Sequence, residues 1–226
     1  METNNNLNAT LGFRDSLKIK ICGMKFPDNI QAVTDLKPDF LGFIFYPTSP
    51  RYAEPLDIDL LLNIPRNILK IGVFVNETQD NILETVKKYS LQGVQLHGSE
   101  SEELCYTLKS IGLLVFKAFQ IAEAVDFNAT EDYEGACDFF IFDTKTAAHG
   151  GSGVKFDWSI LSEYKGETRF LLSGGISLED VETIKLINHP KLAGVDLNSR
   201  FEISPGIKNV DLLAEFFSNI KRTTKA

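Results

Sequence analysis

From residue 18 onward, short apolar runs alternate with longer stretches in which apolar residues recur every three or four positions. The short runs are typical of buried strands, and the longer stretches have the period of amphipathic helices. Eight strands are predicted, at 18–22, 40–45, 70–75, 93–97, 113–118, 139–143, 169–173 and 193–197. The clearest helices are predicted at 77–89, 101–110, 177–188 and 209–220, and a less regular pattern covers 121–133.

Eight strands, each followed by a helix, predict parallel pairing through crossover connections. This alternation fits either a doubly wound open sheet or a closed barrel. The count of eight favours the barrel, and the CGMKFP segment after the first strand lacks the GxGxxG spacing of a dinucleotide-binding sheet. We therefore predict one α/β domain, a (β/α)8 TIM barrel over residues 17–222. A polar, Asn-rich leader at residues 1–16 precedes it and is expected to add little to the fold.

Local signals predict where several helices begin. Pro27 and Asp28 follow the first strand, Asn76 precedes the helix at 77–89, and Ser177 with Asp180 has the spacing of a capping box. Each signal falls directly after a predicted strand. The signals therefore support the same alternation of strands and helices.

Composition and charge narrow the classes of ligand. A net charge of −8 argues against nucleic-acid binding, and an anionic substrate would have to be met by local cations and backbone N–H groups. No apolar run approaches the roughly 20 residues that cross a bilayer, so no membrane partner is expected. Three cysteines without paired spacing indicate reduced thiols in a cytoplasmic protein. Three scattered histidines predict no metal site, and with no exposed apolar stripe we expect a monomer.

Several predicted strands end in polar residues that a packed core would not select. The strand ends read KIKICG, VQLHG, FFIFDTKT, FLLSGG and GVDLNS. In a barrel the carboxyl ends of the strands carry the chemistry. Because side chains alternate along a strand, Lys20 shares a face with Cys22, and Gln95 shares one with His97. We expect these side chains to face a substrate.

Cys22 and Asp143 are the candidate proton-transfer groups. A lone strand cysteine is more often a small buried hydrophobe, and an aspartate after a strand is often a cap or turn residue. Cys22 precedes Gly23 at a strand end, and Asp143 follows an apolar run that would bury an acid. An ordinary thiol, with a pKa of about 8.5, is only about 3 % ionised at pH 7, so a basic role needs a nearby cation or helix N-terminus.

Other segments suit the recognition of anions. Ser173–Gly175 offers backbone N–H groups at the start of a helix, and Asn198 with Ser199 follows the eighth strand, which is where barrels often hold phosphate. Arg51 lies between Pro50 and Tyr52, and such a restrained guanidinium suits a carboxylate. SGG is also a common turn, and a loop arginine is commonly just solvated. The loop at 144–153 contains Gly150, Gly151 and Gly153, and is either a lid or a plain surface loop.

Together these segments resemble the phosphoribosylanthranilate isomerase family of tryptophan biosynthesis. The segments that carry the resemblance are KICGM (20–24), GFIFYPTSPRY (42–52), GVFVN (72–76), VQLHG (94–98), FDTKTAAHGGSGVKFDW (142–158), LSGGI (172–176) and VDLNS…E…PG (195–206). The likeness covers residues 18–217 in order, which is far more specific than any single motif.

The resemblance implies an Amadori rearrangement of the sugar phosphate N-(5-phosphoribosyl)anthranilate, without a cofactor. It assigns the general base to Cys22 and the general acid to Asp143. It implies that Arg51 holds the anthranilate carboxylate and that Asp196 lies near the sugar. Gly174, Gly175 and Ser199 match the phosphate-binding segments. Where the family commonly has a glycine after the strand-eight serine, this chain has Arg200, which either supplies a cation or points outward.

Two alternatives remain at this point. A neighbouring phosphate-binding barrel, such as indole-glycerol-phosphate synthase or the related histidine-pathway isomerase, would share the fold. The histidine-pathway enzyme would be expected to have an aspartate at the position of Cys22, and the synthase would need a longer segment before the first strand. A barrel that binds a sugar phosphate without turning it over would share the anion sites.

Overall fold

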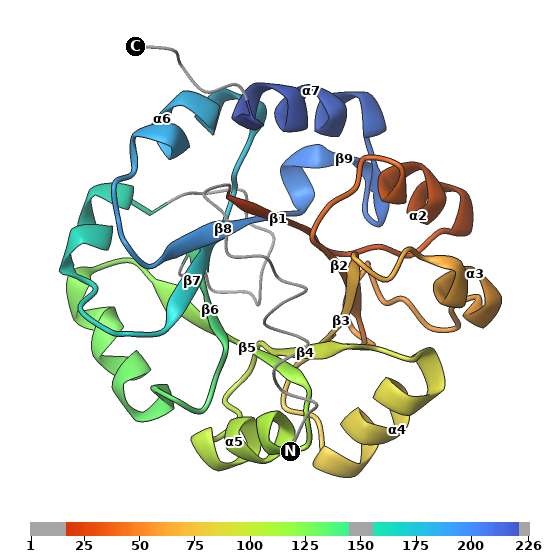
Figure 1. Cartoon of the computed structure of the whole chain (residues 1–226), viewed down its shortest axis with the longest axis horizontal. Helices are drawn as coiled ribbons and strands as arrows, with labels where there is room; N and C mark the ends of the chain where they lie inside the picture. Colours follow the sequence, from red (N-terminus) through yellow and green to blue (C-terminus); the bar gives the residue numbers. More distant parts are fainter. Residues whose placement is uncertain (1–16, 145–155, 222–226) are drawn as a thin grey trace.

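A computed structural model of the chain describes residues 17–144 and 156–221. The predicted leader and most of the loop at 144–153 therefore lie outside the described residues. Eight parallel strands close into a barrel in sequence order, with helices around it (Figure 1), which confirms the predicted TIM barrel. The strands are β1 (Lys18–Ile21), β2 (Phe40–Ile44), β3 (Leu69–Phe74), β4 (Gly93–Leu96), β5 (Leu114–Ile121), β6 (Phe139–Thr144), β7 (Arg169–Leu172) and β8 (Leu192–Leu197). The ring closes where β1 pairs with β8, with Lys20 opposite Asp196.

The outer layer mixes α-helices with 3₁₀ segments. The α-helices are α2 (Pro27–Thr34), α3 (Ile58–Asn63), α4 (Gln79–Tyr89), α5 (Glu102–Ser110), α6 (Val181–Leu186) and α7 (Val210–Lys221). The 3₁₀ segments are η1 (Ala124–Tyr133), η2 (Trp158–Glu163), η3 (Leu178–Asp180) and η4 (Ser199–Phe201). A small antiparallel hairpin, β9 (Glu202–Ser204) and β10 (Ile207–Lys208), follows η4 and had no counterpart among the predicted elements.

The barrel interior is filled with apolar side chains from the first residues of the strands. Phe40 and Phe139 both contact Phe116, with ring centroids 5.3 and 5.1 Å apart, and Ile141 belongs to the same cluster. Because residues two apart on a strand point to the same side, β6 places Phe139 and Ile141 in this plug and Asp143 above them. The plug closes the amino-terminal end of the barrel and leaves the carboxyl ends of the strands for polar groups.

Several predicted boundaries were wrong by a few residues. β1 ends at Ile21 and β4 at Leu96, so Cys22 and His97 each lie one residue beyond a strand, whereas β5 continues to Ile121. The pattern at 121–133 forms 3₁₀ rather than α structure, and the helix predicted at 177–188 is split into η3 and α6. Local apolar spacing of three to four residues does not distinguish these helix types.

Two predicted helix starts were confirmed and a third was wrong. The helix α2 begins at Pro27, as predicted. The capping box is present, with Asp180 Oδ2 accepting hydrogen bonds of 2.7 Å from Ser177 N and 2.9 Å from Ser177 Oγ. The cap of α4 is Thr78, whose side chain accepts from Asn81 N, rather than Asn76. Asn76 instead has a left-handed backbone with φ of 52° and takes part in a loop network described below.

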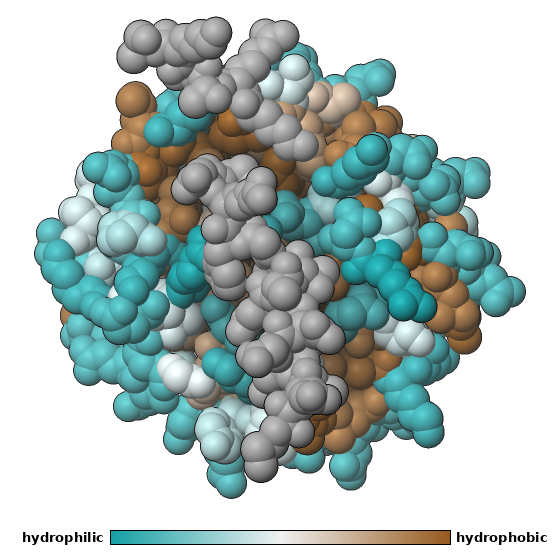
Figure 2. Space-filling model, viewed as in Figure 1, coloured by the Kyte–Doolittle hydropathy of each residue, from teal (hydrophilic) through white to brown (hydrophobic). Residues whose placement is uncertain are grey.

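Hydrophilic side chains surround much of the face seen in Figure 2. Among the described residues, the exposed large apolar side chains are spread over several elements, and only Ile58 and Leu62 share a helix, α3. They are Phe26, Ile58, Leu62, Tyr106, Ile111, Val125, Leu186 and Ile203. Single exposed apolar residues are normal on a soluble surface, and the expectation of a monomer stays a prediction. In the described part of the chain, none of the helices has the length and apolar content needed to cross a membrane.

Candidate active site

One half of the candidate site lies at the carboxyl ends of β1 and β8. Lys20 Nζ lies 2.9 Å from Asp196 Oδ1, and both side chains are buried. Gly42 on β2 leaves room for this group, since a Cβ placed there would lie 3.0 Å from Cys22 Sγ and 3.2 Å from Lys20 Nζ. The strand alternation that predicted a shared face for Lys20 and Cys22 is thus confirmed.

Opposing charges act on the Cys22 thiol. Burial raises its pKa, the charge of Lys20 lowers it, Asp196 raises it and Lys208 lowers it, and the net result is a raised pKa. Lys20 remains an ammonium, because the charge and hydrogen bond of Asp196 outweigh burial and raise its pKa. The expected cation is therefore present, but Asp196 shares its charge. The thiolate is disfavoured in the ligand-free protein and is a correspondingly strong base once it forms.

The other half lies at the carboxyl ends of β4 and β6. Asp143 is buried, its Oδ1 accepts a hydrogen bond of 2.9 Å from Thr144 N, and its Oδ2 lies 3.5 Å from His97 Nε2. Gln95 Nε2 is 2.8 Å from His97 Nδ1, so these two side chains share a face as predicted. A Cβ on Gly174, whose φ is +87°, would lie 2.8 Å from Asp143 Oδ1. The SGG turn therefore packs directly against the carboxyl group.

Three polar atoms in this half are buried without a hydrogen-bond partner among the described residues. They are Gln95 Oε1, His97 Nε2 and Thr144 Oγ1. Buried polar groups in proteins are nearly always paired, because an unmade hydrogen bond costs about 1–3 kcal/mol. Buried polar atoms without partners at the carboxyl end of the barrel are free to form hydrogen bonds with a polar ligand.

Ser173 connects the two halves. Its hydroxyl lies 3.4 Å from Asp196 Oδ2, and it directly precedes Gly174 and Gly175, whose φ values are +87° and +66°. A left-handed backbone at two consecutive positions favours glycine and turns both N–H groups out of the sheet ladder. β1 and β6 are three steps apart around the ring, through β8 and β7, so the halves face one another across the barrel mouth.

Arg51 is held by Glu202, the acidic residue of the VDLNS…E…PG stretch, for which no role was predicted. Its Nε lies 2.9 and 3.0 Å from the two carboxylate oxygens of Glu202, and its Nη2 lies 2.6 Å from Oε2. Lys208 Nζ binds the same carboxylate at 2.8 Å and Asn198 Oδ1 at 2.7 Å. Asn198, expected near phosphate, therefore has its side-chain oxygen bound to a buried lysine. A separation of 151 residues explains why no local pattern pairs Arg51 with Glu202.

Two further expectations concern the segment after β8 and metal binding. Ser199 is the first residue of the short 3₁₀ helix η4, and Arg200 is exposed. Within residues 17–144 and 156–221, no group of three or more His, Cys, Asp or Glu side chains is placed to hold a metal ion. All three cysteines are free thiols.

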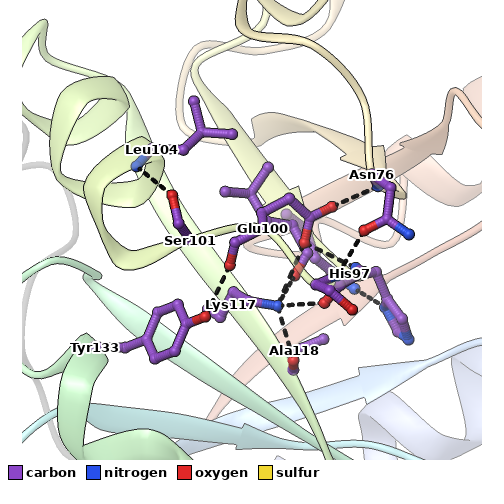
Figure 3. Close-up of polar contacts among 12 residues, drawn as sticks. Asn76, His97, Glu100, Ser101, Leu104, Lys117, Ala118 and Tyr133 are labelled. Carbon is purple, nitrogen blue, oxygen red and sulfur yellow. Dashed lines mark hydrogen bonds and ion pairs between the residues drawn. The ribbon is translucent and has the colours of Figure 1, made fainter.

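A buried network fixes the loop that carries His97 (Figure 3). Lys117 Nζ, on the outer face of β5, lies 3.3 Å from Leu96 O and 2.7 Å from Gly98 O, the carbonyls on either side of His97. It also pairs at 3.3 Å with Glu100, which accepts hydrogen bonds from the N–H groups of Gly98 and Asn76. This network was not predicted, because Lys117 and Glu100 are 17 residues apart and lie outside the strand ends that indicated the site.

Comparison with known proteins identifies the family. Residues 19–219 match the model of the N-(5'-phosphoribosyl)anthranilate (PRA) isomerases. The chain belongs to this family. The isomerase of Parabacteroides distasonis is 48 % identical over 204 residues, covering 89 % of this chain and 92 % of that one. That of Phocaeicola vulgatus is 43 % identical, covering 90 % and 98 %.

Solved structures of phosphoribosylanthranilate isomerases have the same fold. The enzyme from Thermotoga maritima superposes with a TM-score of 0.81 at 35 % identity, covering 91 % of this chain and 98 % of that one. A phosphoribosylanthranilate isomerase in complex with reduced 1-(o-carboxyphenylamino)-1-deoxyribulose 5-phosphate gives 0.79 at 31 % identity, with the same coverage. Monomers generated from the dimeric T. maritima enzyme give 0.78 at 33 % identity, also over 91 % and 98 %. The chain is thus an isomerase of the PRA isomerase family.

Proposed function

We propose that this isomerase converts N-(5-phosphoribosyl)anthranilate into 1-(2-carboxyphenylamino)-1-deoxyribulose 5-phosphate in tryptophan biosynthesis, with Asp143 as general acid and Cys22 as general base. The observation that carries the proposal is the placement of Cys22 and Asp143 at the ends of β1 and β6, across one barrel mouth. The orphaned atoms of Gln95 and His97 beside Asp143 supply further hydrogen-bonding groups for the sugar.

The first step is ring opening. Asp143 donates a proton to the furanose ring oxygen, the bond from that oxygen to C1′ breaks, and the arylamine nitrogen supplies the electrons that form a protonated imine. Asp143 suits this role because it is buried beside a barrel mouth, where water competes less for the proton. His97, 3.5 Å from the carboxyl group, is placed to contact the same part of the sugar.

The second step moves the C2′ proton. The Cys22 thiolate removes it, the electrons neutralise the imine, and an enolamine with a C2′ hydroxyl results. Protonation at C1′ and loss of the hydroxyl proton then give the ketone. Burial raises the pKa of Cys22 and the charge of Lys20 lowers it, so the ammonium helps to form the thiolate. Asp196, paired with Lys20, is expected to lie near the sugar.

The substrate carries two anionic groups into a chain of net charge −8. We assign the phosphate to the backbone N–H groups of Gly174 and Gly175 together with the segment Asn198–Ser199, and the anthranilate carboxylate to Arg51. These placements put the phosphate beside β7 and β8, as is common in TIM barrels, and the arylamine beside β2. Local cations and N–H groups then offset the unfavourable overall field.

The proposal is tested with the purified protein by following the loss of phosphoribosylanthranilate fluorescence. We expect Cys22→Ala and Asp143→Asn each to lower turnover by about 10²- to 10⁴-fold, because each removes one proton-transfer group. Both variants should fold, since neither changes the apolar plug of the barrel.

The matched control is Cys105→Ala, which removes a buried thiol from α5, outside the barrel. It should retain turnover per folded molecule. Substantial activity in Cys22→Ala would remove the thiol from the mechanism. Decay no faster than the spontaneous background in the unaltered protein would favour a barrel that only binds a sugar phosphate.

A further inference from the structure

Glu202 lies at the centre of a charged cluster with Arg51 and Lys208, beside the carboxyl end of β1. It is the first residue of β9, and its side chain is 5 % exposed. Its carboxylate accepts hydrogen bonds from Arg51 Nε and Nη2, from Lys208 Nζ and from Gly206 N at 3.0 Å. Two side-chain cations and one backbone N–H group therefore hold one buried carboxylate.

The contact with Glu202 determines which edge of Arg51 remains available. A guanidinium offers a side edge, formed by Nε and Nη2, and an end edge, formed by the two Nη groups. Glu202 occupies the side edge. The stem of Arg51 passes over Gly23, where a Cβ would lie 2.8 Å from Arg51 Cδ. Because Gly23 follows Cys22, this packing places the guanidinium next to the proposed base.

Glu202 is itself firmly anchored, which distinguishes it from a side chain that a substrate could displace. Lys208, its second cation, has a fully buried side chain. Asn29 of α2 holds the backbone of Lys208 through two hydrogen bonds. Its Oδ1 accepts from Lys208 N at 2.8 Å, and its Nδ2 donates to Lys208 O at 2.9 Å. Moving Glu202 away would leave the buried ammonium of Lys208 and the part-buried guanidinium of Arg51 without their counter-ion, which is costly.

The charge state of Glu202 agrees with this role. Burial raises its pKa, but the hydrogen bond from Arg51 and the charge of Lys208 outweigh burial and lower the pKa overall. Glu202 is thus an anion at neutral pH, held between two cationic side chains. The end edge of Arg51 keeps its N–H donors for a second carboxylate.

We propose that Glu202 is a positioning residue that orients Arg51 so that its end edge receives the carboxylate of the arylamine, and that it thereby gives the enzyme its preference for carboxylated substrates. This inference rests on the proposed function, in which Arg51 binds that carboxylate. Without Glu202 the guanidinium would be free to rotate about several bonds, and ordering it would reduce the binding energy.

Binding of two ligands separates this role from a merely structural one. The first is reduced 1-(o-carboxyphenylamino)-1-deoxyribulose 5-phosphate, the compound bound to the related isomerase structure, and the second is the same compound without the carboxylate. We expect Glu202→Gln to weaken binding of the first ligand by roughly 10- to 100-fold and of the second by less than about twofold. In turnover assays KM should rise while kcat changes little, because the carboxylate takes no part in the chemistry.

The control variant is Glu134→Gln, which alters another part-buried carboxylate with several donors, including Thr168 N at 2.9 Å, away from the strand ends. It should leave both affinities unchanged. Equal loss of both ligands in Glu202→Gln would indicate a structural role, and tighter binding of the carboxylated ligand would mean that Glu202 competes for Arg51. Either result overturns the inference. Absence of turnover in the unaltered protein would instead count against the proposed function.

Discussion

Two of the buried lysine–carboxylate pairs in this barrel lie on opposite sides of its wall. Lys20 points inward and meets Asp196 at 2.9 Å, beside Cys22. Lys117 points outward and meets Glu100 at 3.3 Å, beneath the loop that carries His97. The side chains of all four residues are no more than 5 % exposed. Burial and charge alone would therefore not indicate which pair belongs to the site.

The difference lies in how completely each pair is satisfied. Lys117 has three carbonyl acceptors besides Glu100, and Glu100 accepts two backbone N–H groups. Lys20 pairs with Asp196, whose second oxygen has a longer contact of 3.4 Å with Ser173. The outer pair is saturated by the backbone and fixes a loop. The inner pair borders the Cys22 thiol and the proposed substrate site, and it keeps hydrogen-bonding capacity for both.

Replacement of Lys20 should give the largest effect on catalysis. We expect Lys20→Met to lower kcat by about 10³-fold, because the thiol loses the ammonium that lowers its pKa and the base is no longer formed. Steady-state kinetics measure this. The control is Lys70→Met on β3, a buried lysine whose ammonium binds Leu61 O, and its turnover should stay within about twofold of the unaltered enzyme. Equal losses in both variants would remove the special role of Lys20.

Replacement of Lys117 should instead lower stability. Lys117→Met leaves Glu100 and several carbonyls buried without their partner, and we expect a loss of about 3–5 kcal/mol in the free energy of unfolding. Urea denaturation measures it. Turnover per folded molecule should fall less than about tenfold, because the hydrogen bond of 2.9 Å from His97 N to Phe74 O on β3 does not depend on Lys117.

Paired substitutions sharpen the contrast. Replacing both partners of a buried ion pair is often nearly neutral. The double variant Lys20→Met with Asp196→Asn should therefore have a free energy of unfolding close to that of the unaltered protein, while remaining inactive. Lys117→Met with Glu100→Gln should stay destabilised, since the carbonyls of Leu96 and Gly98 still lack a donor. A free energy of unfolding equal to that of the unaltered protein in this second double variant would show that those carbonyl contacts contribute little to stability.

The smallest expected effect is a change in thiol titration. Burial raises the pKa of Cys22, so kcat/KM should continue to rise with pH beyond about 8.5, where an ordinary thiol is half ionised. Because Asp196 raises this pKa, Asp196→Asn should move the titration to lower pH. Thiolate absorbance, taken as a difference from Cys22→Ala, reports it. A shift of the titration to higher pH would contradict the conclusion that Asp196 raises the pKa of Cys22.

The parts of the fold that follow from local pattern were predicted well. Apolar runs identified all eight strands, and alternation along β4 placed Gln95 and His97 on one face. Helix type was harder, because η1 has the apolar content of a helix without a regular amphipathic face. The β9–β10 hairpin was missed, since two- and three-residue strands carry almost no periodicity.

Contacts between distant segments explain what was missed in the site. Cys22, Lys20 and Asp143 were found because each is an unexpected residue at a strand end. Glu202 and Lys208 lie in a short loop hairpin, where charged residues are ordinary, and their meeting with Arg51 depends on closure of the ring. Their pairing is a property of the folded barrel and not of any local segment.

Closure of the barrel has a consequence for synthesis of the chain. Lys20 and Asp196 are 176 residues apart, and β1 reaches its second neighbour only when β8 has left the ribosome. Until then Lys20 lacks its carboxylate, and Arg51 lacks Glu202. A nascent chain therefore cannot acquire activity gradually, because β8 completes the hydrogen-bonded ring and the proposed proton-transfer site together. Shortening the gene from its 3′ end into the codons for β8 should abolish both at once.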